Sequence, residues 1–194
     1  MPGLRLAVLV SGSGTNLQTV IDAAQTGFLK SEIACVISNK ASAYGLVRAK
    51  ESAIPSYFIE GKRDDYDEVL LQTLQENQVD LIVLAGYLKI VDTTLLQAYK
   101  GRVINIHPSL LPKYGGKGYY GLHVHTAVVA AKETESGATV HYVDEGIDTG
   151  QIILQESVPV QVDDTPETLQ KRILDEVEHH LLVDAIKKLE EEMA

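Results

Sequence analysis

An asparagine and a histidine stand two residues apart in the apolar run VINIHPSLLPKYGGKG, residues 103–118. Alternate side chains of a strand point to the same face, so Asn105 and His107 would lie side by side. Buried polar groups cost free energy unless they are paired, and Pro108 ends the hydrogen-bond ladder directly afterwards. An amide and an imidazole that converge at a strand end can stabilise a developing oxyanion, and the imidazole can move a proton. A network of satisfied polar groups without chemistry is the structural alternative.

A second candidate is the acidic, glycine-rich loop HYVDEGIDTGQII, residues 141–153, which joins two strand-like runs. It offers the carboxylates of Asp144, Glu145 and Asp148. One carboxylate near His107 would favour the charged imidazole and accept a proton during a reaction. Taken alone, the loop is explained more simply as a solvated connection.

A third candidate is the glycine-rich turn VSGSGTNLQ, residues 10–18. Backbone N–H groups at the start of a helix point outward and form an anion site. The turn is not a Walker loop, because no Gly-Lys-Ser/Thr follows, and Leu17 occupies the third glycine position of a dinucleotide fingerprint. A tight strand-to-helix turn with an asparagine cap is the structural alternative. Two glycines with serine and threonine hydroxyls favour a monophosphate site.

Metal binding is suggested by the stretch GLHVHTAV, which holds His123 and His125. Both histidines fall at an expected helix start, where side chains two residues apart diverge. No second cluster has ligand spacing, although His179 and His180 are adjacent in the last expected helix. We therefore predict that the protein uses no metal.

The elements that must position these residues are short apolar runs that alternate with helical patterns, as in an α/β sheet. Four nearly continuous apolar runs are typical of parallel strands covered on both faces. Two further runs follow one another through a turn-rich stretch, which predicts an antiparallel section near the C-terminus. The six expected strands are residues 4–10, 32–38, 81–87, 102–107, 137–143 and 151–160.

Helical periodicity predicts a helix after Asn16, a second helix over residues 65–77 and a third that begins after Thr165. Thr165 is the expected N-cap of the last helix and Pro166 its first residue. Apolar residues then recur every four positions, at Leu169, Ile173, Val177 and Leu181. The predicted fold is a doubly wound, mostly parallel sheet of the Rossmann type, in which ligands bind beyond the carboxyl ends of the strands.

The composition limits the classes of function. The chain has 194 residues, of which 45% are hydrophobic and 23% charged, with a net charge of −10. This charge argues against a partner bound through phosphate backbones, so we expect neither nucleic acid nor membrane as a partner. No apolar run approaches the roughly 20 residues of a membrane span. The single cysteine, Cys35, fits a buried hydrophobe in a reducing cytoplasm. We predict one domain, residues 1–194.

Three motifs together resemble one known family. GSGTN, NIHPSLLPKY and DEGIDTG, in this order, are similar to the glycinamide ribonucleotide formyltransferases, and the likeness covers essentially the whole chain. NIHPSLLP is specific to folate formyl-transfer enzymes as a class, whereas GSGTN and the chain length favour this family. The resemblance implies formyl transfer from 10-formyltetrahydrofolate to the amine of glycinamide ribonucleotide, in de novo purine biosynthesis.

The resemblance also implies roles for individual residues. Asn105, His107 and Asp148 match the catalytic residues of the family. Gly14, Thr15 and Asn16 match the loop that binds the substrate phosphate, and Glu178 matches an acid that contacts the ribose. The positions that match the surroundings of the formyl-folate are Arg63, Leu88, Lys89, Ile90, Val91 and Asn105.

Two features depart from the family pattern. GGKGYYG is longer than the PG that often follows LPKY, and Lys89 stands where some relatives carry an arginine, which can bind a carboxylate through two hydrogen bonds. The implied mechanism is direct attack of the substrate amine on the formyl carbon. Asn105 and protonated His107 would hold the formyl oxygen, and Asp148 would keep His107 charged and receive the amine proton. It needs no covalent enzyme intermediate.

Three alternatives remain open. A methionyl-tRNA formyltransferase is expected to carry a further C-terminal domain and a basic surface, and a formyltetrahydrofolate hydrolase an N-terminal regulatory domain and HHS in place of HPS. A non-catalytic phosphate-binding module would explain GSGTN but not the residues of the other two motifs. We expect small-molecule substrates as the ligands and a monomer or a homodimer.

Overall fold

The computed structural model describes residues 3–193 and contains one seven-stranded sheet in the order β3-β2-β1-β4-β5-β6-β7. The chain forms two compact units, residues 3–104 with 186–193, and residues 105–185. The strands that pair in the first unit are parallel, and the last two strands of the chain are antiparallel. The predicted fold, a doubly wound and mostly parallel sheet with an antiparallel section near the C-terminus, is confirmed.

The first unit is built on β1 (Arg5–Val10), β2 (Glu32–Ser38), β3 (Ser56–Phe58) and β4 (Leu81–Leu84). The side chains of β1, β2 and β4 are almost all buried, which is why their sequences read as continuous apolar runs. β4 ends three residues earlier than expected. β3 was not predicted, because it is only three residues long and all its side chains are exposed.

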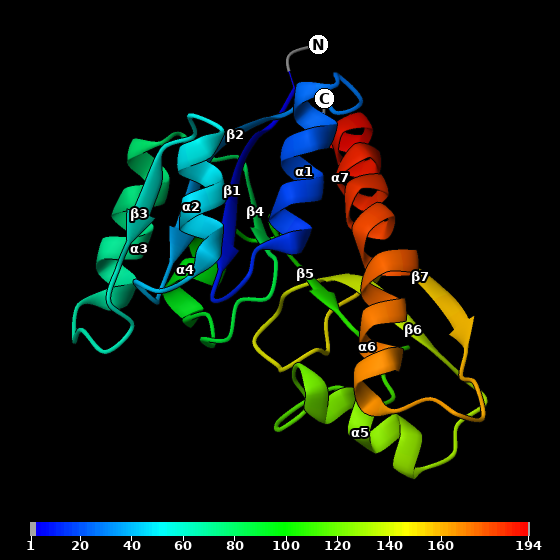
Figure 1. Cartoon of the computed structure of the whole chain (residues 1–194). Coiled ribbons are helices and arrows are strands. Elements are labelled where there is room, and N and C mark those ends of the chain that lie inside the picture. Colours follow the sequence, from blue (N-terminus) through cyan, green and yellow to red (C-terminus); the bar gives the residue numbers. More distant parts are fainter. Residues whose placement is uncertain (1–2, 194) are drawn as a thin grey trace. The chain divides into compact units, whose positions relative to one another are not determined.

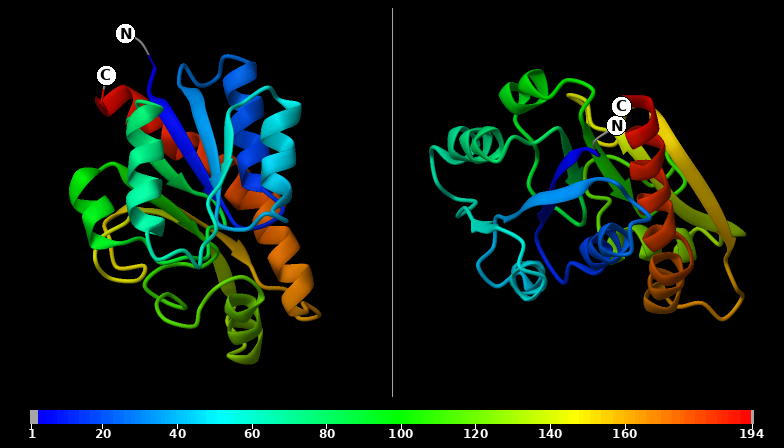
Figure 2. Two further views of the ribbon diagram at one scale, coloured as in Figure 1. Left: turned by 90° about the vertical axis from the view of Figure 1, so that its left-hand side faces the viewer. Right: turned by 90° about the horizontal axis from the view of Figure 1, so that it is seen from above.

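Four helices cover this part of the sheet: α1 (Thr15–Gln25), α2 (Tyr44–Glu51), α3 (Tyr66–Glu76) and α4 (Thr93–Ala98). α1 and α2 lie on one face of the first unit's strands, and α3 and α4 lie on the other (Figures 1 and 2). α1 and α3 are the helices that periodicity predicted. α2 and α4 are short and were missed.

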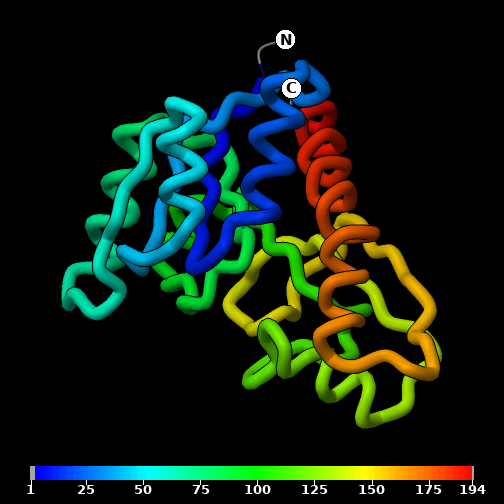
Figure 3. The backbone as a smooth tube through the Cα atoms, in the orientation of Figure 1, coloured from blue at the N-terminus to red at the C-terminus, as the bar shows by residue number. Residues whose placement is uncertain are grey.

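The second unit contains the end of β5 (Val103–His107), with β6 (Glu135–Tyr142), β7 (Ile152–Pro159) and α5 (Leu122–Ala130). β6 and β7 are antiparallel, with a register shift between Val140 and His141. The chain after β5 and after β6 runs through long loops, residues 108–121 and 143–151 (Figure 3). These loops carry most of the glycines and acids that drew attention in the sequence.

The last helical segment is interrupted by a π-helical turn. α6 (Pro166–Ile173) begins with a capping box between Thr165 and Thr168, which confirms the predicted N-cap and the proline at the first position. The turn η1 (Leu174–Glu178) follows, and α7 (His179–Met193) continues from it. The wide turn explains why apolar residues recur every four positions in this segment, since an α-helix has only 3.6 residues per turn.

The buried core agrees with the composition. Cys35 is fully buried in β2, and burial raises the pKa of its thiol to about 12, as expected for a small apolar side chain rather than a reactive thiol. None of the helices within residues 3–193 is long and apolar enough to cross a bilayer.

Candidate active site

The second unit brings together Asn105 and His107, the expected strand-end pair, and Asp148, one of the three loop carboxylates that the sequence offered. Asn105 contacts a residue of β6, and His107 lies beside the loop after β6. Nδ1 of His107 lies 3.6 Å from Oδ2 of Asp148, and the two side chains are 6% and 12% exposed. The backbone N–H of Gly116 donates to the same Asp148 oxygen at 3.0 Å. The two long loops therefore meet at this carboxylate.

A fourth residue of this cluster, His141, was not predicted. Its Nε2 lies 3.1 Å from Nδ2 of Asn105 and 3.7 Å from Oδ1 of Asp148. His141 is 2% exposed and directly follows the register shift in the ladder between β6 and β7. A bulge re-aims a side chain, so alternation along β6 gives no sign of this contact. We call Asn105, His107, His141 and Asp148 the polar cluster.

Hydrogen bonds to backbone carbonyls fix where the hydrogens sit in the two imidazoles. Nε2 of His107 lies 2.8 Å from the carbonyl oxygen of Tyr114, and Nδ1 of His141 lies 2.8 Å from that of Tyr142. A carbonyl only accepts, so each of these nitrogens carries a hydrogen. Burial lowers the pKa of His141, which favours its neutral form. Nε2 of His141 then accepts from the Asn105 amide, and Nδ1 of His107 is left facing Asp148.

Asp148 holds an uncommon backbone conformation, with φ of 58°. Asparagine and aspartate tolerate this left-handed region better than most residues. Gly115 lies against it: a methyl group added at Gly115 would lie 3.3 Å from Cβ of Asp148 and 2.5 Å from a Leu111 methyl. The glycines after LPKY thus let the loop approach the carboxylate.

The first unit holds the predicted phosphate loop between β1 and α1. Gly14, with φ of 69°, is the N-cap of α1, and no side chain caps the helix. The asparagine cap considered from the sequence is therefore not found. Thr15 and Asn16 form the first turn of the helix, and the N-terminus of a helix favours an anion. The carbonyl of Gly14 accepts from the backbone N–H of Gln18 at 3.0 Å.

The predicted folate-contact residues of the first unit lie in two places. Residues 88–91 form an irregular segment after β4, in which Leu88 and Ile90 are 54% and 74% exposed. The backbone N–H of Leu88 donates to Oγ of Ser11 at 2.9 Å. Val91 is partly buried.

Two positively charged side chains, Lys89 and Arg63, were also predicted to lie around the formyl-folate. The ammonium of Lys89 lies 4.6 Å from the ring centre of Tyr66. This cation–π contact restrains the lysine side chain. Arg63 donates from Nε and Nη2 to the two carboxylate oxygens of Asp65, each at 2.7 Å. A ligand carboxylate would have to compete with Asp65 for Arg63.

Glu178, predicted to contact the ribose, lies in the second unit as the last residue of η1 and is 8% exposed. π-turns inside helices are frequent at functional sites.

The histidine pair of α5 separates, as the helical spacing predicted. His125 is fully buried, and burial together with the nearby charge of His107 lowers the pKa of His125 to about 4. His123 instead meets the ring of Tyr120, with ring centres 5.0 Å apart. Among residues 3–193, no three His, Cys, Asp or Glu side chains are placed to hold a metal ion.

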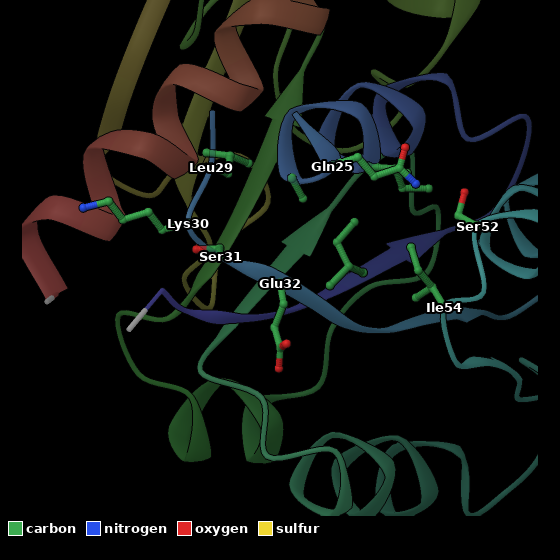
Figure 4. Close-up of a pocket in the computed structure, with 10 residues that line it drawn as sticks. Gln25, Leu29, Lys30, Ser31, Glu32, Ser52 and Ile54 are labelled. Atoms are coloured by element: carbon green, nitrogen blue, oxygen red, sulfur yellow. The ribbon is translucent and has the colours of Figure 1, made fainter. Parts of the chain in front are cut away.

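A hollow of about 380 Å³ lies elsewhere in the first unit, at the start of β2 (Figure 4). It is lined at the C-terminal ends of α1 and α2 by residues that include Gln25 and Ser52, with Ser31 and Glu32 at the strand. Ligands of such sheets bind at the carboxyl ends of strands, and this hollow is at the opposite end of β2. None of the predicted site residues lines it.

Comparisons with known proteins agree with the motifs. A formyl transferase family model matches residues 4–186. The chain belongs to the formyl transferase family. It is 47% identical over 172 residues to the phosphoribosylglycinamide formyltransferase of Haemophilus influenzae, covering 87% of this chain and 79% of that protein. The predicted resemblance is thereby confirmed.

Two further comparisons extend over nearly the whole chain. The chloroplastic phosphoribosylglycinamide formyltransferase of Vigna unguiculata is 42% identical over 192 residues, and this chain spans 61% of its length. The crystal structure of glycinamide ribonucleotide transformylase 1 from Symbiobacterium toebii superposes with a TM-score of 0.91 at 40% identity, covering 97% of this chain and 88% of that one. The chain therefore shares the fold of that relative.

The structure adds His141 and the Tyr114 carbonyl to the residues that the sequence predicted for the site. A histidine near the end of β6 was visible in HYVDEGIDTG, but its partner could be found only from the pairing of strands. The Tyr114 contact is made by a backbone oxygen, which every residue has, so the residue type could not indicate it. The assignment of individual roles to the predicted residues stays a prediction.

Proposed function

We propose that the chain transfers the formyl group of 10-formyltetrahydrofolate to the amine of glycinamide ribonucleotide, a step of de novo purine biosynthesis. The observation that carries the proposal is the polar cluster, found in a chain 47% identical to a phosphoribosylglycinamide formyltransferase. Formyl-folate serves the formyl transferase family as co-substrate. The reaction would need no metal.

The reaction begins when the substrate amine attacks the formyl carbon, and negative charge develops on the formyl oxygen. Asn105 uses one amide N–H on His141, and its second N–H would donate to that oxygen. Protonated Nδ1 of His107 would be the second donor, since Nε2 is committed to Tyr114. Preorganised donors aimed at a developing oxyanion are typically the largest contribution to such catalysis.

Asp148 would act through its charge. At 3.6 Å from Nδ1 of His107, its carboxylate stabilises the imidazolium without forming a close hydrogen bond that would hold the N–H away from substrate. The same carboxylate would take the amine proton, directly or through a water. Collapse of the intermediate then re-forms the formyl C=O bond and breaks the bond to the folate nitrogen, which takes the proton that Asp148 received.

Binding would rest on the remaining predicted residues. We propose that Gly14, Thr15 and Asn16 bind the substrate phosphate through backbone N–H groups and that Glu178 accepts from the ribose hydroxyls. Leu88, Ile90 and Val91 would line the folate, with Arg63 and Lys89 near its carboxylates and Asn105 near its formyl group.

We also propose the extent of the domain, its class of ligand, its oligomeric state and its location. We propose that residues 1–194 act as one formyltransferase domain, supported by a family model that spans both units; residues 1–2 and 194 lie outside the described part. The net charge of −10 supports small-molecule ligands rather than nucleic acid. We propose a cytoplasmic monomer or homodimer without a membrane partner, in keeping with a single buried cysteine.

A folate absorbance assay tests the proposal. Conversion of 10-formyltetrahydrofolate to tetrahydrofolate is expected only when glycinamide ribonucleotide is present. Equal conversion in its absence would identify a formyltetrahydrofolate hydrolase instead. A folded protein that binds glycinamide ribonucleotide but converts no folate in either reaction would be a phosphate-binding module.

A further inference from the structure

Two successive carbonyls of the phosphate loop are held by α2. The backbone N–H of Gly45 donates to the carbonyl of Gly12 at 3.1 Å. Nε of Arg48 donates to the carbonyl of Ser13 at 2.8 Å. Neither donor belongs to the loop or to α1, so the loop is oriented by a helix that carries none of the predicted phosphate contacts.

These bonds decide where the loop N–H groups point. In a trans peptide the carbonyl and the N–H of the next residue point in opposite directions. Because the carbonyls of Gly12 and Ser13 face α2, the N–H groups of Ser13 and Gly14 face away from it. Consecutive N–H groups with this common orientation, ahead of a helix N-terminus, form a concave site for an anion.

Glycines allow α2 to come this close. A methyl group added to Gly14 would lie 2.8 Å from Cα of Gly45, and one added to Gly45 would lie 2.7 Å from a methyl of Val10. Atoms at such distances overlap, so the two backbones are packed against each other without intervening side chains. The contact places Arg48, one turn along α2, beside the loop.

Arg48 is itself held by three neighbours. Besides the Ser13 carbonyl, its Nη1 donates to Oε1 of Gln18 at 3.1 Å, and its guanidinium lies 5.1 Å from the ring centre of Tyr44. A permanent positive charge is thus fixed next to the loop in a chain of net charge −10. A dianionic ligand gains from such a charge even without touching it, because the interaction falls off slowly with distance.

We propose that Arg48 is a positioning residue of the phosphate loop, which orients the Ser13–Gly14 peptide toward a phosphate monoester and adds favourable charge. The proposal rests on the proposed function, which assigns the loop to the substrate phosphate. It concerns affinity for the phosphorylated substrate and not the formyl transfer itself. Its ligand class is a phosphate monoester, with inorganic phosphate as the simplest probe.

The test compares Arg48→Met with Arg102→Met at low ionic strength. Arg102 is a matched control in the same unit, because its Nη2 donates to the Ala98 carbonyl at 2.9 Å and its guanidinium lies 4.9 Å from the Tyr99 ring centre. We expect Arg48→Met to weaken binding of glycinamide ribonucleotide and inorganic phosphate about tenfold, because the Ser13–Gly14 peptide loses the donor that orients it and the loop loses a nearby positive charge. Folate affinity and the saturated turnover rate should stay near those of the wild type.

Arg48→Lys tests whether the charge and a single hydrogen-bond donor are enough to orient the loop. Lysine keeps the charge and can donate to one carbonyl but lacks the planar fork, so we expect part of the lost phosphate affinity to return. Calorimetric titration of each variant with phosphate, glycinamide ribonucleotide and folate provides the measurements. Arg102→Met should leave all three affinities unchanged.

Two results would overturn the assignment: equal phosphate affinity in Arg48→Met and Arg102→Met, or equal loss of phosphate and folate affinity in Arg48→Met. A wild-type protein that binds neither phosphate nor glycinamide ribonucleotide would also reject it. If the wild type binds phosphate and Arg48→Met weakens it, but no formyl group is transferred, the proposed function fails while the role of Arg48 stands.

Discussion

The phosphate loop of the first unit and the polar cluster of the second unit handle charge by different means. The loop would use backbone N–H groups on a glycine turn, where no side chain caps the helix. The cluster consists of four side chains, whose roles depend on where each hydrogen sits. A backbone site is changed by whatever alters the path of the chain, whereas a side-chain site is changed by replacing one functional group.

The difference also separates binding from chemistry. Backbone N–H groups hold a fixed partial charge at every pH, so they suit a ligand that must only be held. Imidazole and carboxylate groups exchange protons, so they suit a reaction in which charge appears and disappears. Substitutions in the loop should therefore alter affinity, and substitutions in the cluster should alter turnover.

The largest effect is expected at Asp148. Asp148→Asn keeps the side-chain shape, can accept from the Gly116 N–H and tolerates a φ of 58°, so it removes little except the charge. Turnover should fall about 10²–10⁴-fold, the range typical of a general acid–base group. Calorimetry should show that both ligands still bind.

Asp144→Asn is the matched control, because Asp144 lies in the same loop. Its Oδ1 accepts from the Gly146 N–H at 3.0 Å and the Thr149 hydroxyl at 2.6 Å. Its turnover should remain close to that of the wild type. Near-normal turnover of a folded Asp148→Asn protein, with a large loss in Asp144→Asn, would move the catalytic role to Asp144.

The next largest effect is expected at Gly14. Gly14→Val places a branched side chain at a φ of 69°, against Gly45, and forces the loop to shift. Affinity for glycinamide ribonucleotide should fall roughly 10²-fold, as for the loss of two hydrogen bonds to a charged group. Folate affinity should change little in the same titrations.

Gly27→Val controls for backbone strain. Gly27 also has a positive φ, 76°, at the other end of α1, and a methyl group there would meet no atom within 4 Å. It should lose thermal stability without losing substrate affinity. If both glycine variants bind the substrate equally well, the loop is only a turn.

In each of the two regions the sequence predicted some of the residues and missed others. Gly14 and the polar residues Asn105, His107 and Asp148 stand in local motifs, and their strands are apolar runs that are easy to recognise. His141 was missed because its contact depends on the register between β6 and its neighbours, and Tyr114 because only its carbonyl takes part.

The same distinction applies to the fold. β1, β2 and β5 were predicted nearly to the residue, because strands covered on both faces are apolar throughout. β3 and α2 have too few buried side chains to produce a pattern. α2 is nevertheless the helix that holds the phosphate loop, so what was missed matters for the site. Local sequence patterns indicate which residues are buried. The contacts by which one element holds another in place are seen only in the structure.

A smaller effect is expected at His141, whose role would be to hold Asn105. His141→Leu removes the acceptor for one Asn105 N–H, and turnover should fall about tenfold, the equivalent of one neutral hydrogen bond. His141→Gln can accept from Asn105 and donate to the Tyr142 carbonyl, so it should recover part of the rate. Equal rates for the leucine variant and the wild type would show that Asn105 needs no such support.

The smallest effect, none at all, is expected from exhaustive chelation. The ring nitrogens of the cluster are already engaged: Nε2 of His107 and Nδ1 of His141 each carry a hydrogen donated to a carbonyl, and Nε2 of His141 accepts from Asn105. Only Nδ1 of His107 is left as a ligand, and one nitrogen beside one carboxylate is a weak metal site. Turnover should therefore be equal before and after dialysis against a chelator. If activity is lost and zinc restores it, the cluster must rearrange around an ion, and His123 and His125 should then be tested as its further ligands.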